Sequence, residues 1–101
     1  MDHFKHVIIK QKAQGLIACL GSADQADGEG SEQMAVLRQV TQNLWERLDI
    51  RLCIADEHPW FTERYHIVGT PTYLLFKGGR EVRRLLGKTD VEGLLSFIRQ
   101  G

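Results

Sequence analysis

The sequence predicts one α/β domain, a three-layer α/β/α sandwich in which helices flank a mixed sheet of about four strands. A strand–helix–strand unit over residues 16–55 implies a parallel strand pair. A β-hairpin over residues 72–86 adds antiparallel strands, and a capped helix closes the chain. With 101 residues, the chain is long enough to bury one core without disulfide or metal, so we treat residues 1–101 as a single domain.

The first third of the chain combines one ambiguous segment with one clear strand. Residues 2–14 carry a helical apolar stripe that begins at Phe4, but the β-branched run 7–9 also suits a strand, so both remain open. Residues 16–20 are continuously apolar, which is typical of a buried central strand. Residues 21–30 are rich in Gly, Ala, Asp and Ser and predict a long loop, whose order the sequence does not decide.

A long amphipathic helix is predicted from Ser31 until Asp49 ends it. Its apolar face consists of Met34, Leu37, Val40, Leu44 and Leu48. Residues 50–55 then predict the second strand. Asp56 is expected to cap a short helix with Pro59 in its first turn, a position that suits proline.

The hairpin and the last helix carry the clearest local signals. Gly78 and Gly79 between two apolar runs predict a tight hairpin turn. Thr89 followed by Glu92 predicts a capping box with Thr89 as the N-cap. The apolar stripe of the last helix consists of Val91, Leu94, Leu95 and Ile98.

Composition and charge restrict the classes of partner. Thirteen basic and thirteen acidic residues give a formal net charge of zero, so neither a nucleic acid nor a membrane surface is expected as a partner. No apolar run reaches the ~20 residues of a membrane span, and the first residues lack a signal peptide's apolar segment, so we expect a cytoplasmic protein. Two local clusters can be solvated faces or a polarised partner surface: Asp24, Asp27, Glu29 and Glu32, and Arg80, Arg83, Arg84 and Lys88.

The loop Gly69-Thr70-Pro71 precedes the first strand of the hairpin. Proline cannot donate a ladder hydrogen bond, so it is tolerated at a strand's first residue, and the Thr70–Pro71 bond is a candidate for the cis isomer. The run from Tyr65 to Arg99 resembles the C-terminal half of thioredoxin, where such a loop, a hairpin, a glycine and a last helix follow in this order. The resemblance implies a thioredoxin-like fold with Pro71 as the family's cis-proline.

The thiol chemistry of that family has no counterpart here. In thioredoxins a Cys-x-x-Cys pair stands at the N-terminus of the helix after the central strand, where the helix end stabilises a thiolate. The corresponding residues 22–30 contain no cysteine, and their carboxylates would raise the pKa of a nearby thiol. The sequence therefore excludes a conventional dithiol–disulfide oxidoreductase.

The two cysteines that the chain does contain are Cys19 and Cys53, both in apolar runs on strands predicted to be neighbours. Apolar surroundings raise a thiol's pKa and lower its reactivity, which predicts inert core residues; a redox-sensing or peroxide-reacting Cys19 is the alternative. No group of residues has a metal-ligand spacing, and no cofactor is expected.

Two functions remain. The first is a non-catalytic thioredoxin-like domain that binds a protein or an extended peptide at the cis-proline groove, in a chaperone, assembly or scaffold role. Its expected contact residues are Gly69, Thr70, Pro71 and Trp60. The alternative is a redox-homeostasis protein that uses Cys19 or Cys53 as a monothiol. The sequence identifies neither the partner nor the oligomeric state.

Overall fold

The structure is a computed structural model that describes residues 14–21 and 31–100. The interpretations of residues 2–14 and 21–30 therefore fall outside the described residues, except at Gln14 and Gly21. The elements in chain order are β1 (Gln14–Leu20), α2 (Ser31–Leu44), β2 (Leu48–Ile54), the 3-10 turn η3 (Ala55–Glu57), α3 (Pro59–Arg64), β3 (Thr72–Lys77), β4 (Arg80–Leu86) and α4 (Val91–Gln100).

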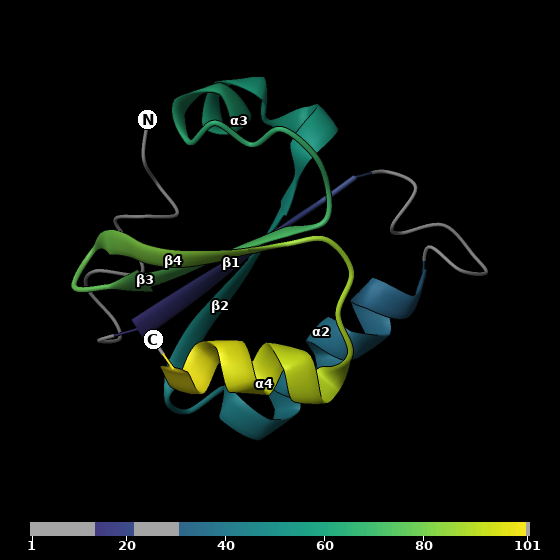
Figure 1. Ribbon diagram of the computed structural model, residues 1–101, viewed down its shortest axis with the longest axis vertical. Helices are drawn as coiled ribbons and strands as arrows, with labels where there is room; N and C mark the ends of the chain where they lie inside the picture. Colours follow the sequence, from purple (N-terminus) through teal and green to yellow (C-terminus); the bar gives the residue numbers. More distant parts are fainter. Residues whose placement is uncertain (1–13, 22–30, 101) are drawn as a thin grey trace.

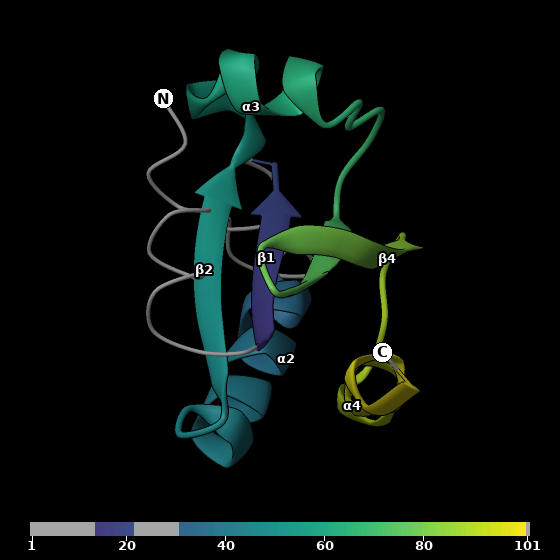
Figure 2. The ribbon, with the colours of Figure 1, turned by 90° about the vertical axis from the view of Figure 1, so that its left-hand side faces the viewer.

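The strands form one mixed sheet of four strands in the order β2-β1-β3-β4. The pair β1–β2 is parallel, whereas β1–β3 and β3–β4 are antiparallel. Helix α3 lies over one face of the sheet, and α2 and α4 lie over the other (Figures 1 and 2). The predicted three-layer sandwich with a mixed sheet is confirmed. Among the described helices, none is both long and apolar enough to cross a membrane.

The central strand β1 separates two hydrophobic clusters. Leu16 and Ala18 point to the side of α2 and α4 and join the cluster that contains Phe97. Ile17 and Cys19 point to the opposite side and join the cluster under α3. Side chains alternate across a strand, and a strand covered on both faces is apolar at every position. The continuous apolar run of β1 follows from this arrangement.

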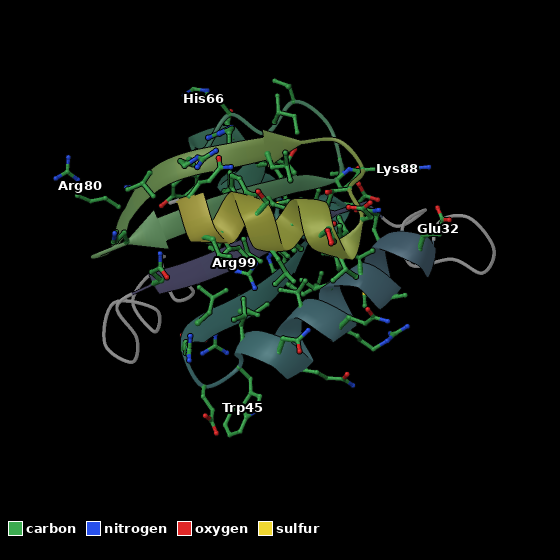
Figure 3. The ribbon with its side chains drawn as sticks, turned by 60° about the horizontal axis from the view of Figure 1, so that its bottom comes forward. Glu32, Trp45, His66, Arg80, Lys88 and Arg99 are labelled. Carbon is green, nitrogen blue, oxygen red and sulfur yellow. The ribbon has the colours of Figure 1, made fainter. Side chains whose placement is uncertain are left out.

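The boundary between the long helix and the second strand differs from the prediction. Helix α2 ends at Leu44 instead of at Asp49, and Leu48 and Asp49 begin β2. These two residues are in register with Gln14 and Gly15 of β1, so the sheet ladder fixes their conformation despite the helical spacing. Trp45 lies just beyond the end of the helix with 61% of its surface exposed (Figure 3).

The hairpin turn agrees with its sequence signal, but the helix cap does not. Gly78 and Gly79 have φ angles of 60° and 82°, which suits the positive φ that type I′ turns require at both central positions. The N-cap of α4 is Asp90 instead of Thr89, because the Asp90 carboxylate accepts a hydrogen bond of 2.8 Å from the Gly93 N–H. The N-cap of α4 therefore lies one residue later than the sequence predicts.

The basic cluster of β4 is divided between the two faces of the sheet. The guanidinium of Arg83 lies over a ring of α4, 5.2 Å from its centroid. Arg84 points the other way and binds carbonyl groups of the loop after α3. Arg80 and Lys88 lie toward opposite ends of the molecule (Figure 3). Strand alternation separates Arg83 from Arg84, and the length of β4 separates Arg80 from Lys88, so the four residues do not form one basic surface.

Candidate functional site

A shallow groove of about 230 Å³ lies beside Pro71. The loop between α3 and β3 forms one wall, and the end of β4 forms the other. The residues that line it are Val68, Gly69, Thr70, Pro71, Thr72, Leu86 and Gly87. Three of the four predicted contact residues, Gly69, Thr70 and Pro71, therefore lie together in one groove.

Two hydrogen bonds fix the loop that lines this groove. The Thr72 hydroxyl donates a bond of 2.6 Å to the Gly69 carbonyl and closes the loop on itself. The Gly87 N–H donates a bond of 2.9 Å to the Pro71 carbonyl and joins the loop to the end of β4. The Thr70–Pro71 peptide bond is cis, and Pro71 itself is buried. The loop is therefore anchored to the sheet on both sides.

Thr70 is an exposed residue of the loop whose backbone groups, the N–H and the C=O, are not paired within the described residues. An unpaired backbone donor and acceptor can form hydrogen bonds with the main chain of an extended ligand. This edge of the loop can therefore accept main-chain pairing from a ligand.

Two exposed aliphatic side chains flank this backbone edge. Val68 is 90% exposed and Leu86 is 61% exposed, although both are apolar. The sequence prediction missed both. A signal exists for Leu86, since adjacent strand residues face opposite sides: Leu85 packs against the core, and Leu86 must then turn away from it. Val68 carries no such signal, because a loop has no periodicity.

Trp60, the fourth predicted contact residue, lies on α3 and is not among the residues that line the groove. It is 38% exposed, and its ring makes edge-on contacts with His58 and Phe61 at centroid distances of 6.4 Å and 5.8 Å. These contacts fix Trp60 on the outer surface of α3, above the buried Phe61.

The cysteines lie directly below α3. Cys19 on β1 and Cys53 on β2 are register partners in the parallel pair, and both are free thiols with no exposed surface. Cys19 is also the register partner of Thr72 on its other side. The predicted neighbouring strands thus place the thiols next to each other and one strand away from the groove.

The thiols change each other's pKa. A hydrogen bond between the two side chains, together with burial, raises the pKa of Cys19 far above its ordinary range. The same hydrogen bond lowers the pKa of Cys53, while burial acts against this lowering. The two thiols therefore do not lose their protons independently of each other.

Potential metal ligands do not gather in the part of the chain that the structure describes. No three His, Cys, Asp or Glu side chains there are close enough to hold a metal ion together. The two thiols alone provide fewer than the four ligands of a closed structural zinc site.

Comparison with known proteins gives partial sequence matches. No family model matches the chain. The chain is 42% identical over 45 residues to a thioredoxin from Chlamydia caviae. It is 32% identical over 68 residues to a thioredoxin from Alicyclobacillus acidocaldarius. The matches span 45% and 64% of this chain and only 44% and 65% of those two relatives.

Solved structures match over nearly the whole chain. Mitochondrial thioredoxin 3 from Saccharomyces cerevisiae, in its oxidised form, has a TM-score of 0.80 at 20% identity, covering 97% of this chain and 87% of that one. The oxidised thioredoxin from Plasmodium falciparum has a TM-score of 0.79 at 19% identity, covering 99% and 90%. The chain has a thioredoxin-like fold, as the resemblance implied.

Proposed function

We propose that this chain is a non-catalytic thioredoxin-like domain that binds an extended segment of another protein in the groove beside Pro71. The observation that carries the proposal is the exposed residue Thr70, whose backbone groups are unpaired within the described residues, between two exposed aliphatic side chains, Val68 and Leu86. A chaperone, assembly or scaffold role follows if the bound segment belongs to an incompletely assembled protein. The pair of buried free thiols suits a reducing compartment such as the cytoplasm.

Strand addition is the binding mode that these features favour. In this mode main-chain hydrogen bonds provide affinity, and side chains at alternate positions provide specificity. Thr70 would supply the main-chain donor and acceptor. Val68 and Leu86 would receive apolar side chains of the ligand on either side of it. We therefore expect an extended ligand with apolar residues at alternate positions.

The alternative is a redox-homeostasis protein that acts through Cys19 or Cys53 as a monothiol. The name of the two sequence relatives favours it, since both are called thioredoxin. Burial argues against it, because a thiol that exchanges with a protein disulfide must be reached by that disulfide, and both thiols have no exposed surface.

The binding proposal is tested with a random peptide library displayed on phage. Selected peptides are added to ¹⁵N-labelled protein, and the amide signals are followed by NMR. We expect shifts concentrated at residues 68–72 and 86–87. Leu86→Asp should weaken binding by at least tenfold, because it places a charge on an apolar wall. Val82→Asp is the matched control: Val82 is also an exposed aliphatic residue of β4, but it does not line the groove.

Two results would contradict the proposal. Peptide-induced shifts that lie elsewhere would move the site away from Pro71, and equal losses in the Leu86 and Val82 variants would show that the groove gives no specificity. The alternative is tested separately by insulin reduction with dithiothreitol. Activity that is lost in Cys19→Ser or Cys53→Ser would establish a thiol mechanism and overturn the non-catalytic assignment.

A further inference from the structure

The proposed binding function does not use the two thiols, and the monothiol alternative uses only one of them. Cys19 and Cys53 are the only cysteines of the chain, and the fold sets them opposite each other on neighbouring strands. Both side chains are in the cluster on the α3 side of the sheet, which also contains Ile17, Phe61, Leu74 and Phe76. A dithiol has therefore been assembled by two strands that are far apart in the sequence.

Among the described residues, the helix that covers this dithiol is short. Helix α3 has only six residues, and Phe61 is its single buried side chain. Elements with few buried apolar contacts open locally at low free-energy cost. Local opening of α3 would admit a small reagent to the thiols, whereas a folded protein substrate needs a larger opening.

We propose that Cys19 and Cys53 are a peroxide-reactive redox site, at which hydrogen peroxide converts the buried dithiol into a disulfide between β1 and β2. The substrate class is a small hydroperoxide. The site is distinct from the groove beside Pro71, and its chemistry does not need a cysteine in residues 22–30.

The reaction balances in two steps. The thiolate of Cys53 attacks an oxygen of hydrogen peroxide; the O–O bond breaks, an S–O bond forms, and the released hydroxide takes up a proton to give water. The Cys19 sulfur then attacks the sulfenic sulfur of Cys53; the S–S bond forms, the S–O bond breaks, and the Cys19 proton leaves with the hydroxyl group as a second water. Two thiols are oxidised, and one peroxide is reduced.

The directions of the pKa shifts agree with this order. Cys53 is the thiol whose pKa is lowered, so it is the one that supplies a thiolate. The pKa of Cys19 is raised, so Cys19 retains its proton and hydrogen-bonds to Cys53 until the second step.

General strand spacings favour a disulfide here that can be reduced again. Neighbouring strands lie about 4.8 Å apart, which is within the roughly 4.4–6.8 Å that separates the Cα atoms of bridged cysteines. The Cβ atoms of a parallel register pair keep about this spacing, however, whereas bridged Cβ atoms are usually about 3.8 Å apart. The disulfide must pull the strands together, and strained disulfides are readily reduced.

Oxidation of the thiols should also change the conformation of the groove. Cys19 is the register partner of Thr72, and the Thr72 hydroxyl donates a hydrogen bond to the Gly69 carbonyl in the loop. We expect peptide affinity to change several-fold when the disulfide forms. This consequence rests on the proposed function, whereas the disulfide does not. A disulfide that forms in a protein that binds no peptide would overturn the proposed function alone.

The test uses the native protein and equimolar hydrogen peroxide. After removal of peroxide, the protein is denatured, alkylated with iodoacetamide and weighed as an intact chain. Because the chain has only two cysteines, an intramolecular disulfide can join only this pair. We expect the number of alkyl groups to fall from two to none in a monomer and to return to two after dithiothreitol. Retention of both alkyl groups, or a disulfide-linked dimer, would overturn the proposal.

Single variants test the order of the steps. In Cys19→Ala the sulfenic acid of Cys53 has no resolving thiol, so dimedone should trap it; in the wild type the trapped fraction should be small. Cys53→Ala should react much more slowly with peroxide, because Cys19 is a poor source of thiolate. Faster trapping on Cys19 than on Cys53 would overturn the assignment of Cys53 as the attacking thiol.

Discussion

The guanidinium group of Arg84 on β4 donates a hydrogen bond of 2.9 Å to the backbone carbonyl of Tyr65, where the chain leaves α3. It also donates one of 3.3 Å to the carbonyl of His66, which has a left-handed backbone conformation with a φ of 55°. Glu81 accepts a further bond of 2.6 Å from Arg84 Nε and orients the guanidinium. Arg84 thus fixes the start of the loop that leads to Pro71.

Replacement of Arg84 by Met should loosen that loop without touching the lining of the groove. Methionine keeps an apolar stem but removes the donors to Tyr65 and His66. We expect a loss of about 1–2 kcal/mol in the free energy of unfolding, and faster hydrogen exchange of the amides in 66–70. Arg83→Met is the control, since Arg83 contacts α4 instead. Equal exchange in the two variants would show that Arg84 does not hold the loop.

A buried polar network connects α2, β3 and the start of α4. The Tyr73 hydroxyl donates to the Gln33 side-chain oxygen, and the Gln33 amide donates a bond of 2.9 Å to the Thr89 carbonyl. We expect Tyr73→Phe to cost about 1 kcal/mol and Gln33→Leu about 2–3 kcal/mol, because Leu leaves several polar groups without their partner. Urea unfolding measures both. The double variant should lose less stability than the sum of the two single losses, and additive losses would contradict the network.

The corrected N-cap of α4 gives a direct prediction. Asp90→Ala should destabilise the protein by about 1 kcal/mol, because the Gly93 N–H loses its acceptor, whereas Asp90→Asn should retain most of the stability. Thr89→Ala should have a smaller effect than Asp90→Ala in thermal unfolding. The reverse order would restore Thr89 as the cap.

Replacements of the first glycine of the hairpin turn should differ in their effect on stability. Gly78 has a φ of 60°, and a Cβ built there would meet nothing within 4 Å, so conformation alone decides the outcome. Gly78→Asn should be close to neutral, since Asn-Gly suits a type I′ turn. Gly78→Val should cost roughly 1–2 kcal/mol, because β-branched residues disfavour this conformation. Equal midpoints in urea would argue against a conformational origin.

The thiol pair should make stability depend on pH in both directions. Thiols of the unfolded chain titrate at about pH 8.5. Between the lowered pKa of Cys53 and this pH, the unfolded state binds more protons than the folded state. The free energy of unfolding therefore rises with pH in this range. Above about pH 8.5 the folded state keeps the Cys19 proton that the unfolded state has lost, so stability falls, by at most about 1.4 kcal/mol per pH unit.

The measurement compares the wild type with the Cys19→Ala/Cys53→Ala double variant, in which neither group titrates. Denaturant unfolding at a series of pH values gives the difference in free energy. This difference should be largest near the ordinary thiol pKa and should decrease on either side. A difference that is constant with pH would show that the thiols do not change each other's ionisation.

Local sequence signals predicted the kinds and the order of the main elements. The apolar run of β1, the spacing of α2, the two glycines of the hairpin and the stripe of α4 each specify a structure through nearby residues only. The position of Gly69, Thr70 and Pro71 before β3 also follows from local chain chemistry, because proline suits the first residues of a strand. Local signals alone placed the cap of α4 one residue away from Asp90.

What the sequence by itself determined is therefore the layered α/β fold and the composition of the Pro71 loop. Only the tertiary structure decided that Leu86 and Val68 flank this loop, that Arg84 anchors its start, and that β2 begins at Leu48. The same is true of the register that sets Cys19 opposite Cys53. The physical reason is that these relationships depend on strand register and strand pairing. Outside the hairpin, where the turn sets the register, both are set by contacts between residues far apart in the chain.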